Sequence, residues 1–249
     1  MEEITGRFDS LTLEEMGKVE LMNRVDSKFV TTVDKIRELL EACSRDYYVQ
    51  EIGGRRNMPY HTVYYDTEDT DMYYQHQRGK KTRQKIRTRL YEGSMTIPFL
   101  EIKRKNNKGR TKKKRVSMEE GEILDQYTEF IEKNSYYTPE HLTPQIENHF
   151  YRITLVDKAM TERITIDTGL HFHNFTTGMS LDLDNTGIIE WKRDGISGKS
   201  GFGRLLRELH IHESGFSKYC MGMALTNPEL RQNRIKARLR KILKRPHIS

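Results

Sequence analysis

Hydrophobic and polar residues alternate along much of the chain, which predicts β-strands because successive side chains of a strand point to opposite faces. The alternation is strongest in residues 83–92, 95–105 and 110–118. The segments between them, Gly93-Ser94 and Asn106 to Gly109, contain residue types typical of hairpin turns. Further strands are predicted over residues 23–31, 47–52, 60–66, 145–160, 162–168, 170–175, 179–183 and 187–193.

Helices are predicted where apolar residues recur every three or four positions. Thr32 is a suitable N-cap for a helix in which Ile36, Leu39 and Leu40 belong to one apolar stripe. In residues 122–133 the predicted apolar face comprises Ile123, Leu124, Tyr127, Phe130 and Ile131. Other helices are predicted over residues 10–22, 69–77, 201–211 and 217–225, and in the C-terminal tail.

Strands dominate, short turns join them, and no strand–helix–strand rhythm appears, so the predicted fold class is α+β. We expect an antiparallel β-barrel that forms a central tunnel, with helices packed outside it. One such domain would cover residues 1–228, followed by a basic C-terminal helix or tail over residues 229–249. The apolar stripe of that tail suits a helix that caps the barrel, docks on a membrane partner or lies on anionic lipid.

The polar faces of the predicted strands are mostly basic. Lys85, Arg87 and Arg89 share one face of their strand, and Ile86 and Leu90 share the other. Taken one strand at a time, the simplest interpretation is a sheet with one face in water. Because these faces are long and helices are available to cover the apolar side, we expect the charged side to line a tunnel for anions or phosphates. The same alternation places these residues on polar faces: Arg24, Asp26, Lys28, Glu101, Lys103, Lys113, Arg115, Arg163, Asp167, Glu190 and Lys192.

Charge is concentrated in two regions of the chain. The 249 residues include 43 Lys and Arg against 36 Asp and Glu, a net charge of +7, and the mean hydropathy is −0.81. Residues 229–249 carry eight basic residues and one acidic residue, so residues 1–228 are neutral overall. Residues 78–115 nevertheless hold sixteen Lys or Arg and two Glu. A field of one sign concentrates counter-ions, so this region implies a polyanionic partner.

Two carboxylates stand among these cations. Glu101 and Glu190 each precede a lysine by two positions, in the sequences E-I-K and E-W-K. Such a carboxylate could form an ion pair that neutralises part of the tunnel. It could also hold Mg²⁺ or Mn²⁺, since these ions take one or two carboxylates together with substrate phosphates. We favour the metal for Glu190, and both interpretations stay open for Glu101.

Eight short motifs, in a fixed order across nearly 200 residues, resemble one known family. They are R-V-D-S-K-F from Arg24, Y-Y-D-T from Tyr64, K-I-R-T-R-L from Lys85, F-L-E-I-K from Phe99, K-K-R from Lys113, E-R-I-T-I-D from Glu162, I-I-E-W-K from Ile188 and F-S-K-Y from Phe216. In this combination the chain is similar to the polyphosphate polymerase domain of the vacuolar transporter chaperone (VTC) complex. That domain belongs to the triphosphate tunnel metalloenzymes, within the CYTH-like superfamily.

The resemblance implies a tunnel barrel, ATP as substrate, and Mn²⁺ or Mg²⁺ as cofactor. The enzyme would transfer the γ-phosphoryl group of ATP onto a polyphosphate chain, or would hydrolyse triphosphates. The metal would lie on Glu190, with Glu101 as a second candidate. The residues implied in catalysis are Lys28, Arg87, Arg89, Lys103 and Arg163, and those implied in phosphate binding are Lys113, Arg115, Arg152, Ser217 and Lys218. Arg24, Lys85 and Lys192 join the phosphate-binding set because of the strand faces that they share with these residues.

One motif departs from the CYTH pattern. That branch begins with E-x-E-x-K, whereas this chain has Arg24, Asp26 and Lys28 at the same spacing. The missing first glutamate favours the VTC branch and leaves the number of metal ions open. Ser217 and Lys218 begin a predicted helix, where the helix dipole favours an anion, although Ser217 could equally be a plain N-cap. Removal of Arg87 or Arg89 is expected to weaken triphosphate binding with little effect on stability.

Other functions and locations follow less directly from the sequence. A polyanion-binding module without catalysis is one alternative. Nucleic acid is not expected as a partner, because the basic residues between Arg78 and Arg115 are not interleaved with aromatic residues; that segment contains only Tyr91 and Phe99. No secretion signal or membrane span appears, and Cys43 and Cys220 suit a reducing compartment. We therefore expect a cytoplasmic protein, or one held at the inner face of a membrane by a partner of the basic tail.

Overall fold

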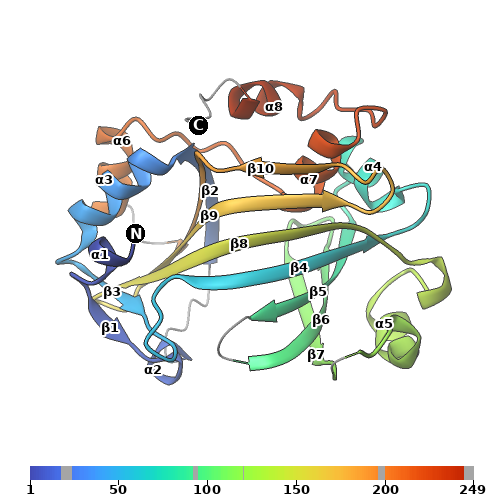
Figure 1. Cartoon of the computed structure of the whole chain (residues 1–249), viewed down its shortest axis with the longest axis horizontal. Coiled ribbons are helices and arrows are strands. Elements are labelled where there is room, and N and C mark those ends of the chain that lie inside the picture. Colours follow the sequence, from blue (N-terminus) through green and yellow to red (C-terminus); the bar gives the residue numbers. More distant parts are fainter. Residues whose placement is uncertain (18–23, 92–94, 120, 196–199, 244–249) are drawn as a thin grey trace.

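The computed structural model describes residues 1–17, 24–91, 95–119, 121–195 and 200–243. In these ranges eleven strands form one sheet, and its main path runs β2-β11-β9-β8-β4-β5-β6-β7 with antiparallel neighbours throughout. In Figure 1, β4, β8 and β9 cross the middle side by side, and β5, β6 and β7 turn away from them. The strands of this path are β2 (Arg24–Thr32), β4 (Met58–Asp66), β5 (Arg83–Tyr91), β6 (Met95–Lys105), β7 (Thr111–Ser117), β8 (Thr143–Asp157), β9 (Glu162–Asn174) and β11 (Thr186–Asp194).

Three short strands extend the sheet at its sides. β1 (Asp9–Leu11) is parallel to β3 (Tyr47–Gln50), β3 is antiparallel to β8, and β10 (Ser180–Leu183) is antiparallel to β9. Between the end strands β2 and β7 no pairing occurs within the described ranges, so the sheet is barrel-like without being strictly closed. The free edge of β2 is partly covered by a loop, because the backbone N–H of Ser214 donates to the carbonyl of Lys28 at 2.9 Å.

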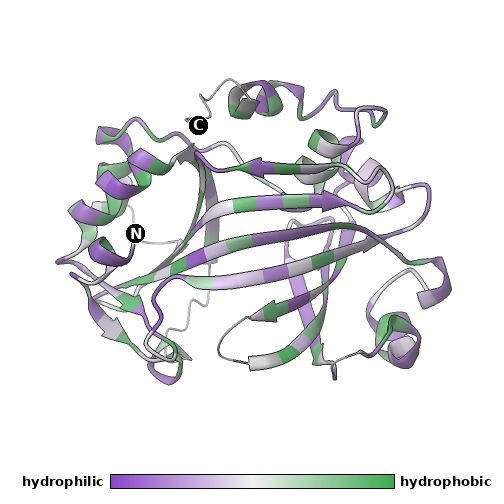
Figure 2. Ribbon diagram, viewed as in Figure 1, coloured by the Kyte–Doolittle hydropathy of each residue, from purple (hydrophilic) through white to green (hydrophobic). Residues whose placement is uncertain are grey.

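The alternation predicted from the sequence is visible along the strands of Figure 2. On β11, Ile189 and Trp191 belong to a buried cluster with Leu39 and Phe202, from helices that cover the outside of the sheet. Glu190, between them, points to the opposite side, because successive side chains alternate. The helices are α1 (Glu2–Thr5), α2 (Leu13–Gly17), α3 (Val33–Cys43), α4 (Asp71–Gln77), α5 (Thr128–Asn134), α6 (Gly201–Glu208), α7 (Lys218–Thr226) and α8 (Lys236–Leu243).

The predicted N-cap of α3 is confirmed, and α3 with α6 covers the outer face as expected. The side chain of Thr32 accepts a hydrogen bond from the backbone N–H of Lys35 at 3.4 Å. Ile36, Leu39 and Leu40 are completely buried. Full burial of such aliphatic side chains contributes roughly 1.5–3 kcal/mol each, so this stripe anchors α3 to the sheet.

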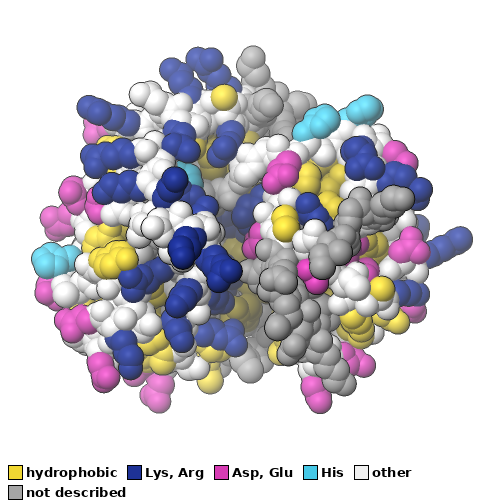
Figure 3. All heavy atoms as spheres, turned by 180° about the vertical axis from the view of Figure 1, so that it is seen from behind, with side chains coloured by type: hydrophobic (Ala, Val, Ile, Leu, Met, Phe, Trp, Pro, Cys, Tyr) yellow, Lys and Arg dark blue, Asp and Glu magenta, His cyan; other side chains and the backbone are white. Residues whose placement is uncertain are grey.

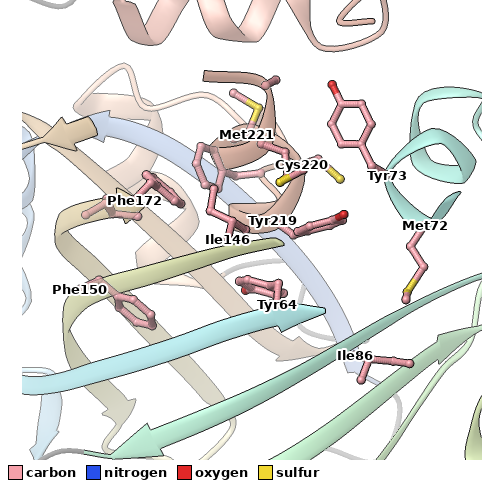
Figure 4. Close-up of a cluster of buried hydrophobic side chains, with 14 of the residues drawn as sticks. Tyr64, Met72, Tyr73, Ile86, Ile146, Phe150, Phe172, Tyr219, Cys220 and Met221 are labelled. Carbon is pink, nitrogen blue, oxygen red and sulfur yellow. The ribbon is translucent and has the colours of Figure 1, made fainter. Parts of the chain in front are cut away.

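Helix α7 lies on the other, concave side of the sheet. Its Tyr219 ring lies 5.5 Å from the ring of Tyr64 in β4, and Gly222 is so close to Phe172 in β9 that a Cβ atom there would lie 2.5 Å from that ring. Figure 4 shows Tyr219 and Met221 of α7 among the side chains of Tyr64 and Phe172. The helix therefore lies within the curve of the sheet, which brings its first residues next to the inward-facing charges.

The C-terminal helix α8 packs on the body of the protein. Ile235, Leu239 and Ile242 are buried in the same cluster as α7, so the apolar stripe predicted for the tail faces the protein. Residues 244–249 lie outside the described part of the chain. Within the described ranges, no helix combines the length and apolarity needed to cross a bilayer.

Three local predictions were wrong. A helix was expected over residues 10–22, and α2 does occupy residues 13–17, but residues 9–11 form β1, because Leu11 is buried with Val156 and Met16; residues 18–22 lie outside the description. Residues 162–168 and 170–175 form one strand, since the positive φ of Gly169 (+59°) accommodates a register shift opposite β8. The helix expected over residues 122–133 begins as a 3₁₀ turn over residues 124–127, and Ile123 is 61% exposed. The predicted Gly93-Ser94 turn falls on residues that the structure does not describe.

Candidate functional site

Strands β5, β6 and β7 form one wall of the tunnel, and their register brings basic residues side by side. Lys85, Lys103 and Lys113 are direct neighbours across the three strands, and in the next inward row Arg87 and Arg115 flank Glu101. The predicted common face of Lys85, Arg87 and Arg89 matches this register, because each has a neighbour on β6 that also points inward. Figure 3 shows Lys and Arg side chains gathered beside a hollow on the side of the molecule opposite to that of Figure 1.

Glu101 is held between two cations and is fully buried. Arg87 donates to its Oε2 from both Nε (2.8 Å) and Nη2 (2.6 Å), and Lys113 forms an ion pair with its Oε1. Burial alone would raise the pKa of Glu101, but Arg87 and Arg89 hold it well below its usual value. Glu101 is therefore ionised, and both of its carboxylate oxygens already contact cations. This favours the ion-pair interpretation of this residue over the metal-ligand one.

Arg87, Glu101 and Lys113 form a clamp, by which we mean one carboxylate shared by two cations. The neighbouring cations Arg89 and Lys103 have no carboxylate partner among the described residues. Arg89 donates to the hydroxyl of Thr62 at 3.4 Å, and its guanidinium lies 5.5 Å from the ring centre of Tyr60. The positive charge of Arg87, together with burial and Arg89, lowers the pKa of Lys103 to about 5. This wall is therefore short of negative charge, and a bound phosphate would supply it.

A second clamp joins β8, β9 and α7. Arg152 donates to both carboxylate oxygens of Asp167, at 2.6 and 2.7 Å, and Lys218 at the start of α7 forms an ion pair with the same carboxylate. The ammonium group of Lys218 also lies 3.6 Å from the ring centre of Phe150. Burial lowers the pKa of Lys218 to about 7, even though Asp167 opposes this shift. Arg152 and Lys218 are thus brought together, as their assignment to one site requires.

Ser217 has two roles at the start of α7. Its hydroxyl accepts a hydrogen bond from the backbone N–H of Cys220 at 3.3 Å, which makes it the N-cap. It also accepts a hydrogen bond from the ammonium group of Lys85 at 2.7 Å. The plain N-cap interpretation is therefore incomplete, because Ser217 connects α7 to the basic wall of β5.

A third clamp lies on β2 and β11. Lys28 contacts one oxygen of Glu190 at 2.7 Å, and Lys192 lies 3.8 Å from the other. Burial would raise the pKa of Glu190, but Lys192 and Lys28 hold it well below its usual value. The Glu190 side chain keeps 21% of its surface exposed. Opposite it on β9, the buried hydroxyl of Thr165 has no hydrogen-bond partner within the described ranges.

These features fit a hard divalent cation at Glu190 better than at Glu101. The carboxylate of Glu190 is ionised and partly accessible, and an unpaired oxygen of Thr165 lies on the neighbouring strand. Mg²⁺ and Mn²⁺ accept such oxygen ligands and complete their shell with water and phosphate. Both oxygens of Glu101 already contact cations, and no part of that side chain is exposed.

Three of the predicted site residues, Arg163, Arg115 and Arg24, belong to none of the three clamps. Arg163 donates to the carbonyl of Met16 at 3.0 Å, so this contact ties it to α2. Arg115 is exposed, and its guanidinium lies 4.8 Å from the ring centre of Phe99. The backbone of Arg24 is paired with β11, but its side chain lies outside the description.

Apart from Glu101 and Glu190, the sequence did not single out the groups that hold the cations in place. Asp167 lay on the predicted polar face of its strand, and that position was the one available signal for its role. Tyr60 and Tyr64 face the arginines of β5, within 6 Å of Arg89 and Arg87. Nothing in the spacing of these tyrosines distinguishes them from ordinary core residues.

Two solved structures are similar to this chain, and the first of them supports a tunnel fold. A putative adenylyl cyclase of Hippeastrum, described as having a dominant triphosphatase activity, is 12% identical with a TM-score of 0.52, over 82% of this chain and 96% of that chain. A putative adenylate cyclase of Vibrio parahaemolyticus is 13% identical with a TM-score of 0.46, over 80% of this chain and 97% of that chain. At these identities the likeness concerns the fold alone.

Comparison with curated proteins finds no match. The family model of the VTC domain, however, matches residues 23–227. This range contains all eleven strands of the sheet except β1, all three carboxylate clamps and α7. The chain therefore belongs to the VTC domain family.

Proposed function

We propose that this protein is a metal-dependent phosphotransferase that moves the γ-phosphoryl group of ATP onto a polyphosphate chain inside its basic tunnel. One observation carries the proposal. Glu101, Asp167 and Glu190 are each already shared by two cations, which leaves Lys85, Arg89 and Lys103 without a carboxylate partner among the described residues. Such a surface is best satisfied by a ligand with several negative charges in a row.

The arrangement suits phosphoryl transfer, which requires positioning and charge neutralisation more than covalent chemistry by the protein. We assign the triphosphate to the wall of β5 and β6, where Arg89 can fork onto phosphate oxygens and Lys103 can regain its proton beside them. Glu190 would hold Mg²⁺ or Mn²⁺, which would neutralise charge that develops on the phosphate oxygens. The terminal phosphate of the growing chain is itself anionic near neutral pH, so no side chain need act as a general base.

A neighbouring wall, formed by β8, β9 and α7, would hold the acceptor chain. Arg152 and Lys218 share one carboxylate between two positive charges, so the pair keeps a net positive charge. Lys85 and Ser217 connect this pair to the wall of β5. A polyphosphate could therefore contact cations continuously from one wall to the other.

A triphosphatase is the second candidate, because the Hippeastrum protein with the same fold is described as having that activity. The same site would hydrolyse triphosphate if water reached the position of the acceptor phosphate. The deciding experiment is incubation of the purified protein with ATP and Mn²⁺ or Mg²⁺, with and without a short polyphosphate primer, followed by sizing of the products. A ladder of polyphosphate supports the proposal, and ADP with orthophosphate alone supports the triphosphatase. Binding without turnover would leave a polyanion-binding module.

The basic surface of α8 is the remaining candidate for a partner. Its apolar residues are buried against the body, so the surface left for docking is rich in Arg and Lys. We propose that a membrane protein or its anionic surroundings would bind there. Nothing in the tunnel chemistry depends on that partner.

A further inference from the structure

A row of imidazoles crosses the outer face of the sheet, on the side away from the tunnel. His61 in β4, His149 in β8 and His171 in β9 are direct neighbours across the three strands, and Asp182 in β10 follows in the same row. Their side chains face outward, because Thr62, the residue after His61, contacts Arg89 on the tunnel side. The phosphate-binding site uses none of these residues.

His61 and His149, which are stacked neighbours in this row, both lie close to the carboxylate of Glu147. Nε2 of His61 lies 3.1 Å from Oε2 of Glu147, and Nε2 of His149 lies 3.9 Å from the same oxygen. The rings of His61 and His149 are stacked, with centres 4.1 Å apart and planes inclined by 9°. One potential ligand atom from each of the three residues lies within 4.8 Å of the others.

We propose that His61, Glu147 and His149 bind a divalent transition-metal ion, with Zn²⁺ as the best match. Ligand atoms about 2.0 Å from zinc in a tetrahedron are roughly 3.3 Å apart, so small side-chain rotations would bring these three into place. Two imidazoles and one carboxylate, with water as the fourth ligand, are a donor set that zinc accepts readily. Magnesium prefers oxygen ligands alone, so this site and the tunnel would select different metals.

The surroundings suit a metal in two further respects. The three side chains are 28%, 24% and 43% exposed, so an ion can reach them without unfolding of the sheet. Next in the row, Nδ1 of His171 lies 2.7 Å from a carboxylate oxygen of Asp182. The negative charge of Asp182, next in the row, favours a cation nearby.

The site would act as a clamp between two strands. His149 directly precedes the register shift between β8 and β9, and His61 belongs to the neighbouring strand β4. A shared metal would fix β4 and β8 at this irregular point. Since Tyr60 and Phe150, the residues beside the ligands, face the tunnel, the metal would stiffen the wall from outside.

The experiment titrates Zn²⁺ into the purified full chain by calorimetry, and repeats the titration with Co²⁺ while visible absorption reports the coordination geometry. We expect one site per chain, a tetrahedral Co²⁺ spectrum, and a higher melting temperature with Zn²⁺. Affinity should fall as the pH is lowered, because protons compete with the metal for the imidazole nitrogens. The combined variant His61→Ala with His149→Ala should lose about 100-fold or more in affinity.

Three controls make the result specific. His141→Ala removes a histidine that contacts the hydroxyl of Thr138, and His212→Ala removes a histidine of the loop before α7. Glu190→Gln removes the tunnel ligand. All three should keep the Zn²⁺ affinity of the wild type, and Glu147→Gln should lose it with minimal change of shape. Absence of Zn²⁺ binding, or equal binding by wild type and by the His61 and His149 double variant with its fold intact, would overturn the proposal.

Discussion

Arg87 and Arg89 lie two residues apart on one face of β5, yet in the described part of the chain Arg87 alone is bonded to a carboxylate. Arg87 makes two hydrogen bonds of 2.8 and 2.6 Å to Glu101, whereas Arg89 makes a single bond of 3.4 Å to Thr62. Both guanidiniums are almost fully buried. Arg87 therefore helps to keep a buried negative charge stable, while Arg89 offers its donors to a ligand.

Substitution of these two arginines should have different main effects, on stability for Arg87 and on triphosphate binding for Arg89. Arg87→Ala should destabilise the protein by about 2–3 kcal/mol, less than the full cost of an unpaired buried charge because Lys113 still contacts Glu101. Arg89→Ala should leave stability unchanged or raise it, because it relieves repulsion from Arg87 and Arg152. It should weaken triphosphate binding by about 1.5–3 kcal/mol. Urea unfolding and calorimetric titration with triphosphate measure the two effects.

This pair corrects an expectation from the strand pattern, which treated the two arginines as equivalent and both as dispensable for stability. Equal losses of stability in Arg87→Ala and Arg89→Ala would show that the Glu101 clamp has no special role. Arg87→Lys is a useful intermediate variant, since it keeps the charge and loses the two-pronged contact.

Glu190→Gln should abolish metal-dependent turnover and leave the fold intact, because the amide keeps the shape of the side chain and loses its charge. Glu101→Gln is the matched control. We expect it to lower stability, because Arg87 and Lys113 would lose their shared counter-charge. Turnover at several Mn²⁺ concentrations, together with thermal melting, separates the two variants. Turnover by Glu190→Gln close to that of the wild type would place the metal elsewhere.

Lys103 should make triphosphate binding depend on pH. Its pKa in the folded protein is about 5, so it is neutral near pH 7, and a bound phosphate would raise that pKa. Binding should therefore take up a proton, with a loss of affinity of up to about tenfold per pH unit above neutrality from this group. Titrations in two buffers of different ionisation enthalpy measure the uptake. Lys103→Met should abolish it, and proton uptake that persists in Lys103→Met would contradict this assignment.

The same residue should affect the stability of the free protein. An unfolded lysine binds a proton below about pH 10, whereas folded Lys103 binds one only below about 5, so the unfolded chain holds more protons in between. The contribution of Lys103 to the free energy of unfolding should therefore increase with pH between about 5 and 10. In Lys103→Met this rise should be smaller, which unfolding curves at pH 6 and pH 9 would reveal. An identical pH dependence in both proteins would mean that Lys103 is charged after all.

Polyphosphate should protect the protein against heat, and long chains should protect better than orthophosphate because they reach both walls of the tunnel. The gain should shrink in high salt, where charges are screened within about 3 Å at 1 M. A thermal-shift series with orthophosphate, triphosphate and longer chains tests this. Equal shifts for all three would contradict an extended binding surface.

The strand alternation was enough to predict which residues of β5 face the tunnel, because a period of two leaves no other choice once one face is apolar. It could not predict that Arg152, Asp167 and Lys218 meet, since that depends on the register of β8 against β9 and on the position of α7. The pattern likewise could not predict that Arg163, which the resemblance implies in catalysis, donates to the carbonyl of Met16 in α2. The short strand β1 was missed because burial of Leu11 against a distant strand outweighs a local helical pattern.

The position of α7 also determines when the site can exist during synthesis of the protein. Lys218 reaches Asp167, and Tyr219 hydrogen-bonds to Asp66, only after every strand of the sheet has been translated. The pairing of β2 with β11 likewise joins one of the first strands to the last. A nascent chain on the ribosome would therefore present an incomplete basic groove. It would gain its full affinity for phosphate chains when the α7 segment emerges.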